Sequence, residues 1–291
     1  MKVVYGHTDS IYCTVDSVEE AENSLVVLNE HVREIFPNVM GLEEHPVTLE
    51  FEKYFESLGV GCVKNRNAGL ITWKDGAFLD EKEFTMTGFT AKRVSITKLA
   101  KETQLKVLHM WVENKSEAEI VDFLSDKYNE VLSGHIKINE ILKRSRYREE
   151  RFNVRCANCK RKNTFGALIS HGVCCNQMNL QTLGGKRPII GAGVEGVVFF
   201  NSKNVEKIED SYLYCRIAEC NETYLHPIKQ EATIPNYVAG VTESDFEGYQ
   251  PDWNHYAESV VKKAEPIFMA MGWDIKQITR DKNERRLSEW F

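Results

Sequence analysis

The sequence lacks a secretory signal, internal repeats and any apolar segment long enough to cross a bilayer. These absences argue against a secreted protein, a solenoid and a membrane-spanning protein, and no membrane partner is expected. The glycine-rich stretch 184–193 has no Gly-Lys-Ser/Thr ending, so we interpret it as a connection and not as a phosphate loop. Four cysteines stand singly, which is typical of a reducing, intracellular setting: Cys13, Cys62, Cys215 and Cys220.

The chain also lacks an overall excess of positive charge, because its formal net charge is −6. Residues 135–162 nevertheless hold ten Lys or Arg residues against three acidic ones. A basic segment inside an acidic molecule fits contact with nucleic-acid phosphates, although most charge runs are only solvated faces. With 291 residues, 42% of them hydrophobic, the chain can bury a substantial core, and its length suggests two domains.

What is present begins with residues 3–14, where two apolar runs flank a short polar turn. β-Branched and aromatic residues around a Gly/Asp/Ser cluster predict a β-hairpin with Asp9 at its tip. A carboxylate at the tip of a hairpin is a suitable ligand for Mg²⁺, which binds oxygen atoms. Because Asp and Ser are also ordinary turn residues, a purely structural turn remains an open interpretation.

Further elements follow along the chain. Apolar and acidic residues alternate over 48–54, which predicts a half-buried strand with Glu50 and Glu52 on one face. Residues 98–111 carry an apolar stripe at helical spacing, and a second helix is predicted from Ser116 to a stop at Gly134. The sequence therefore predicts an α+β fold.

The hairpin string resembles the third palm motif, motif C, of family B DNA polymerases, usually written Tyr-Gly-Asp-Thr-Asp-Ser. Here it reads Tyr5-Gly6-His7-Thr8-Asp9-Ser10. The resemblance implies that Asp9 ligates catalytic Mg²⁺, with His7 and Thr8 beside it in the catalytic loop. His7 replaces the first Asp of the family motif, and it could hydrogen-bond to a metal-bound water or mark a subunit without activity. The family's next strand carries acidic residues near the metals, which would make Glu50 and Glu52 auxiliary ligands; solvated strand residues are the alternative.

Two further segments are similar to the same family. Residues 63–70 resemble the Lys-Lys-Arg-Tyr-Ala-Gly segment that touches the primer end, and residues 88–104 resemble the junction between palm and thumb. This implies a fold made of the C-terminal part of a polymerase palm over 1–95, an antiparallel sheet with the motif C hairpin, and a mainly helical thumb over 96–291. The implied DNA contacts are Lys64, Asn65, Arg66, Asn67 and Arg93, and the basic segment adds Arg144, Arg146 and Arg148 as candidates.

Residues 156–204 do not fit that resemblance. They contain two short pairs of soft ligands whose spacing could hold one structural Zn²⁺: Cys156, Cys159, His171 and Cys174. Free buried cysteines and a disulfide are the alternatives left open.

The family's exonuclease domain, motif A and motif B are not in this sequence. We therefore expect the C-terminal subunit of a split DNA polymerase, working on primer–template DNA and dNTP with an N-terminal subunit that carries those parts. Two Mg²⁺ ions would complete such a site. A catalytically inactive DNA-binding or scaffold subunit is the first alternative, and a lone phosphoesterase using Asp9 with Glu50 or Glu52 is a weaker one.

Overall fold

The computed structural model describes residues 1–7, 9–63, 65–93, 96–147, 153–155, 162–164, 173–174, 178–179, 191–226 and 231–280. For His7 and for the strands between 153 and 179 it describes the backbone only. The chain forms two compact units. The first comprises residues 1–89, 105–121 and 264–275, and the second comprises 90–104, 122–263 and 276–291, so three helices contribute residues to both.

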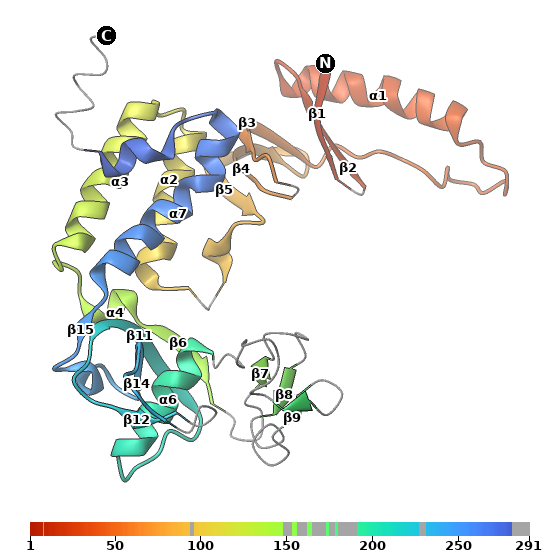
Figure 1. Cartoon of the computed structure of the whole chain (residues 1–291). Coiled ribbons are helices and arrows are strands. Elements are labelled where there is room, and N and C mark those ends of the chain that lie inside the picture. Colours follow the sequence, from red (N-terminus) through yellow and green to blue (C-terminus); the bar gives the residue numbers. More distant parts are fainter. Residues whose placement is uncertain are drawn as a thin grey trace. The chain divides into compact units, whose positions relative to one another are not determined.

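The first unit contains a hairpin, a helix and a three-stranded sheet (Figure 1). Strands β1 and β2 pair with each other, and the sheet has the order β3-β4-β5. The elements are β1 (Lys2–His7), β2 (Ser10–Thr14), α1 (Val18–Ile35), β3 (Lys53–Val60), β4 (Asn67–Lys74) and β5 (Ala77–Thr87).

Three helices lie partly in each unit: α2 (Lys98–Val112), α3 (Glu117–Leu132) and α7 (Trp253–Met271). The second unit adds a small sheet in which β11 pairs with β6, β14 and β15. Its other elements are η1 (Thr90–Lys92), α4 (Ile138–Ile141), β6 (Lys143–Arg146), β7 (Asn153–Arg155), β8 (Lys162–Thr164), β9 (Val173–Cys174), β10 (Met178–Asn179), α6 (Ala192–Lys203), β11 (Ser211–Glu219), β12 (Tyr224–Leu225), β13 (Ala232–Thr233), β14 (Tyr237–Gly240), η3 (Glu243–Phe246), β15 (Gln250–Pro251) and η4 (Ile275–Thr279).

Strand β4 is the centre of the first unit's sheet. It is joined to β5 by the two-residue turn Asp75-Gly76, whose φ angles of 50° and 89° are those that a tight hairpin requires. Ile71 and Trp73 on β4 are buried. Trp111 of α2 reaches β3 at Gly59, where an added Cβ would lie 2.5 Å from its ring. Buried apolar side chains of the sheet and of α2 thus build this unit's core.

The predicted strand over 48–54 is wrong in its position, because β3 begins at Lys53. The partner strand β4 ends at Lys74, and beyond it the Asp75 N–H donates to the Glu52 carbonyl (3.2 Å) without continuing the strand pairing. The Leu49 backbone is instead held by α1: its N–H donates to Asn29 Oδ1 (2.8 Å) and its carbonyl accepts from Asn29 Nδ2 (3.0 Å). Residues 48–52 therefore run beside the sheet's end as an irregular segment.

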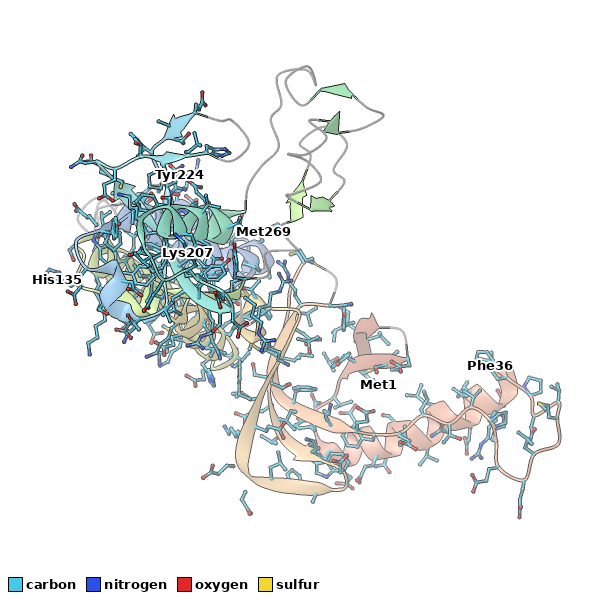
Figure 2. The ribbon with its side chains drawn as sticks, turned by 90° about the horizontal axis from the view of Figure 1, so that it is seen from below. Met1, Phe36, His135, Lys207, Tyr224 and Met269 are labelled. Atoms are coloured by element: carbon cyan, nitrogen blue, oxygen red, sulfur yellow. The ribbon has the colours of Figure 1, made fainter. Side chains whose placement is uncertain are left out.

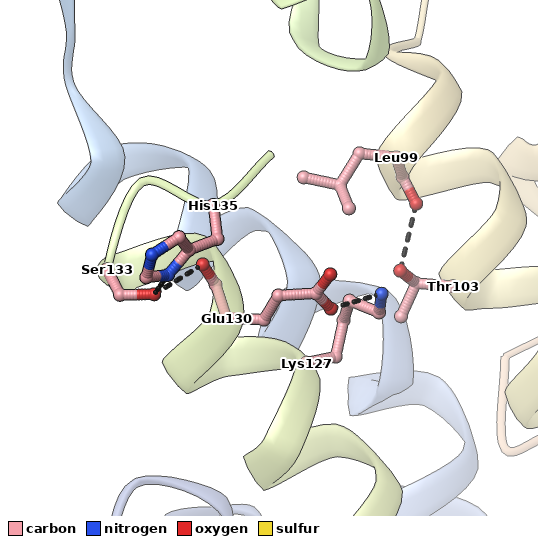
Figure 3. A network of polar contacts seen from close by, with 6 residues as sticks. All are labelled: Leu99, Thr103, Lys127, Glu130, Ser133 and His135. Atoms are coloured by element: carbon pink, nitrogen blue, oxygen red, sulfur yellow. Dashed lines mark hydrogen bonds and ion pairs between the residues drawn. The ribbon is translucent and has the colours of Figure 1, made fainter. Parts of the chain in front are cut away.

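The two predicted helices are confirmed as α2 and α3. Ser116 and Glu119 begin α3 with reciprocal bonds: the Glu119 N–H donates to Ser116 Oγ (3.3 Å), and the Ser116 N–H donates to Glu119 Oε2 (2.9 Å). At the other end Gly134 takes a φ of 75°, which closes the helix. The Ser133 hydroxyl donates to the Glu130 carbonyl (2.9 Å) and lies 2.7 Å from His135 Nδ1 (Figure 3).

Every strand pair among the described residues is antiparallel. The predicted α+β class with antiparallel sheets is confirmed. In the part of the chain that the structure describes, no helix combines the length and the apolar character needed to cross a membrane.

Candidate active site and nucleic-acid interface

Asp9 lies at the tip of the predicted hairpin, which the structure confirms. His7 on β1 is opposite Ser10 on β2, so Asp9 lies in the connection between the two strands. The Asp9 carboxylate is exposed, and the Ser10 hydroxyl donates to its Oδ1 at 3.4 Å. Thr8 and the His7 side chain lie outside the described residues. The loop thus presents a carboxylate whose oxygens are open to a ligand.

Aromatic contacts join the hairpin to the sheet. Tyr5 and Tyr12 have ring centroids 5.4 Å apart, and Tyr12 is 6.1 Å from Phe55 on β3. Burial raises the pKa of the Tyr12 hydroxyl, and the nearby Tyr5 and the Glu52 carboxylate raise it further. The Glu52 carboxylate therefore acts on Tyr12 of the hairpin, and its role as a metal ligand stays a prediction.

Glu50 and Glu52 are both exposed, whereas the residues that precede each of them, Leu49 and Phe51, are half-buried. Exposed and half-buried residues therefore alternate here as the sequence predicts, although these residues do not form a strand. Among the described residues no three His, Cys, Asp or Glu side chains come together as a metal-binding group. A metal site that used Asp9 would need ligands from beyond these residues.

The hairpin also holds the loop that carries the predicted primer contacts. The Tyr5 hydroxyl donates to Asn65 Oδ1 and accepts from the Asn65 N–H, both at 3.2 Å. Asn65 takes a φ of 64°, a conformation that asparagine tolerates better than most residues. The Gly61 N–H donates to the Arg66 carbonyl (2.7 Å) and closes the loop. Asn65, Arg66 and Asn67 are half-buried, and Lys64 lies outside the described residues.

Replacing Tyr5 by phenylalanine is expected to weaken this loop locally. The change removes both hydrogen bonds to Asn65, each worth about 1 kcal/mol, and leaves its N–H without a partner. Amide hydrogen exchange should then be roughly thirtyfold faster at Asn65, since about 2 kcal/mol is lost. Tyr54→Phe is the control, since the Tyr54 hydroxyl makes no hydrogen bond within the described residues. Equal exchange in both variants would contradict the anchoring role of Tyr5.

The remaining predicted DNA contacts lie in the second unit. Arg93 follows η1 and is exposed. Arg144 and Arg146 are exposed on one face of β6, two residues apart, and Arg148 lies outside the described residues. The first unit holds Asp9, Glu50, Glu52, Asn65, Arg66 and Asn67, so the predicted residues are divided between the two units.

Two residues that the sequence analysis did not select stand out in the second unit. Lys143 is half-buried on the opposite face of β6 from Arg144, and burial lowers its pKa. Lys263 on α7 is also half-buried, and burial, followed by the charges of Lys143 and Arg93, lowers its pKa. Because side chains alternate between the two faces of a strand, the Lys-Arg-Ser-Arg sequence could have shown that Lys143 lies on the opposite face from the arginines. No local sequence pattern indicates Lys263.

The predicted zinc ligands cannot be placed from the described residues. Cys156, Cys159 and His171 lie outside them, and Cys174 is described only as part of the β9 backbone. The zinc site stays a prediction.

The family model for DNA polymerase family B matches residues 1–160, more than half of the chain. This range includes the hairpin, the sheet, α2, α3 and β6. The comparison with curated proteins finds no match.

Proposed function

This chain belongs to DNA polymerase family B, and from that premise we propose that it supplies the motif C hairpin and the duplex-gripping thumb of a DNA-directed DNA polymerase. In this proposal a partner polypeptide carries motifs A and B, and the two together extend a primer. The observation that carries the proposal is Asp9, an exposed carboxylate at the tip of a tight hairpin that matches the metal-ligating position of the family motif.

The chemistry is nucleotidyl transfer. The primer 3'-hydroxyl attacks the α-phosphate of the incoming nucleotide in line, and pyrophosphate leaves. Family B polymerases use Mg²⁺, which when bound stabilises the charge on the attacking and leaving oxygens. The Asp9 oxygens fit a hard cation of this kind because they are exposed and otherwise contact only the Ser10 hydroxyl among the described residues.

Other residues of this chain would act on the DNA. Arg66 follows Asn65, which hydrogen-bonds to Tyr5, and in this proposal Asn65, Arg66 and Asn67 contact the primer end, where the Arg66 charge can neutralise a phosphate. Arg93, Arg144 and Arg146 would bind duplex phosphates from the second unit. Contacts of this kind hold any sequence, as a copying enzyme requires.

The surface of the first unit supports a partner. Val3, Val4 and Ile11 on the hairpin are 58%, 47% and 52% exposed, and Val26 and Val27 on α1 are 60% and 51% exposed. None of the residues of α1 is buried. Figure 2 shows this helix between the labelled Met1 and Phe36, with its side chains projecting around it. A two-stranded sheet and an apolar helix face of this kind gain stability when further strands or an apolar surface cover them.

The test is primer extension. The full chain is mixed with the polypeptide that carries motifs A and B, and Mg²⁺-dependent incorporation of dNTP on a primer–template is measured. Extension by the pair and not by either chain alone is the expected result. A complex that binds DNA in a salt-sensitive way without extension would instead identify an inactive DNA-binding subunit, in line with His7 at the position of the family's first Asp.

The Val26→Glu, Val27→Glu double variant is expected to weaken association with that partner at least tenfold. The change places two charges on an apolar face that the partner would have to desolvate. Isothermal titration measures the affinity, and thermal unfolding of the lone chain should be nearly unchanged because both side chains are exposed. Val205→Glu, at a position 97% exposed in the second unit, is the control. Unaltered affinity in the double variant would place the partner surface elsewhere.

A further inference from the structure

A buried glutamine joins three elements of the second unit. Gln104 on α2 is 2% exposed, and its side chain hydrogen-bonds to both η1 and α7. Its Oε1 accepts the Ala91 N–H (2.7 Å) and the Thr90 hydroxyl (3.0 Å), and its Nε2 donates to the Lys263 carbonyl (3.1 Å). Lys263 Nζ also donates to Thr90 Oγ1 (3.3 Å). The buried amide group therefore has partners for both its oxygen and its nitrogen.

The backbones of η1 and α7 both offer polar groups that this side chain can bind. The first N–H groups of a helix have no acceptor within the helix, and Ala91 lies in the first turn of η1 with 0% of its surface exposed. Gln104 Oε1 supplies the acceptor that the buried N–H requires. Pro266 within α7 has no N–H to donate to the turn before it, which leaves carbonyl oxygens there open to a side-chain donor.

The same hydrogen bonds lead to Arg93. The Arg93 N–H donates to the Thr90 carbonyl (2.8 Å), so the residue that Gln104 binds also holds the Arg93 backbone. At the start of α2 the Thr97 hydroxyl accepts the Ala100 N–H (3.2 Å). The Arg93 side chain is exposed. Arg93 therefore extends into solvent from a short connection between η1 and α2, and hydrogen bonds hold the backbone at each end of that connection.

We infer that Gln104 is a positioning residue for DNA binding. It does not touch the DNA, but it holds η1 so that Arg93 meets the primer–template from a fixed backbone. The identity of the ligand rests on the proposed polymerase function. A flexible backbone would lose conformational freedom when the arginine binds, whereas a backbone that is already fixed loses less. Gln104 should therefore strengthen DNA binding only while Arg93 is present.

The experiment is a double-mutant cycle on the full chain, without its partner and without any extension reaction. Fluorescence anisotropy measures the affinity for a labelled primer–template duplex of the wild type, Gln104→Met, Arg93→Ala and the double variant. Methionine keeps the length of the glutamine side chain and removes its hydrogen-bonding groups. Ser125→Ala is the matched control, because Ser125 is 0% exposed and donates to the Ile278 carbonyl (2.8 Å) elsewhere in the same unit.

Gln104→Met is expected to weaken duplex binding by about threefold to tenfold, the range for the ordering of one long side chain. Amide exchange at Ala91 should become roughly tenfold faster, because its buried N–H loses its acceptor. In the Arg93→Ala background the same change should alter the affinity by less than about twofold, since the two residues act as one unit. Ser125→Ala should lower the thermal stability and leave the affinity unchanged.

Equal losses of affinity from Gln104→Met with and without Arg93 would show that the glutamine acts on folding alone, and would overturn the inference. Three other results would overturn it as well: wild-type affinity in a folded Gln104→Met chain, wild-type affinity in Arg93→Ala, or a wild-type chain that does not bind the duplex. A loss that depends on Arg93, together with absent extension in the partner mixture, would keep the inference while the proposed polymerase activity failed.

Discussion

Replacing Asp9 by alanine is expected to reduce Mg²⁺-dependent primer extension by the reconstituted complex by about a thousandfold. A ligand that holds the catalytic cation contributes several kcal/mol to the stabilisation of developing charge, and each ~1.4 kcal/mol corresponds to about a factor of ten in rate. The fold should not change, because the Asp9 side chain is exposed and contacts only the Ser10 hydroxyl among the described residues. Single-turnover extension rates and thermal unfolding measure the two effects separately.

Asp16→Ala is the matched control, because Asp16 is also an exposed acid of the first unit and lies beyond the other end of β2. It removes the same charge and should leave extension nearly intact. Full activity in the Asp9 variant would show that this carboxylate does not ligate the metal. His7→Asp adds a further comparison, since it restores the family's first carboxylate. A wild-type complex that is inactive but gains extension on this change would identify His7 as the cause of the loss.

The second large effect is expected at Gly88, where Gly88→Ala should lower the free energy of unfolding by about 2–4 kcal/mol. Gly88 takes a φ of 75°, which costs an L-residue about 1–2 kcal/mol. A Cβ there would also lie 1.9 Å from the Asn65 carbonyl oxygen, which is backbone and cannot swing away. The loop that carries Asn65 and Arg66 would have to move, so primer binding should weaken together with stability.

Comparison with Gly76→Ala separates the steric part of this effect from the backbone strain. Gly76 has a φ of 89°, and nothing lies within 4 Å of the Cβ it would gain. We expect a loss of only about 1–2 kcal/mol, from backbone strain alone. Urea denaturation of both variants gives the two free energies. Equal losses would show that the close approach to Asn65 does not constrain the fold.

Local sequence determined the elements whose signals lie within a few residues. The hairpin at Asp9 follows from β-branched and aromatic residues around a polar turn, and α3 follows from the Ser116 capping box and the stop at Gly134. The motif C string likewise identified the family that the family model matches. Each of these features depends on neighbours in the chain, so no tertiary contact is needed to predict it.

Tertiary contacts determined the features that the sequence predicted wrongly or did not predict. The strand predicted over 48–54 begins only at Lys53, because its partner strand ends at Lys74 and Asn29 binds the Leu49 backbone. Lys263 reaches Thr90 because Gln104 ties η1, α2 and α7 together, and nothing in the local sequence around Lys263 indicates this. Alternation and helical period report which face a residue occupies, whereas the partner it meets depends on chain segments far away in sequence.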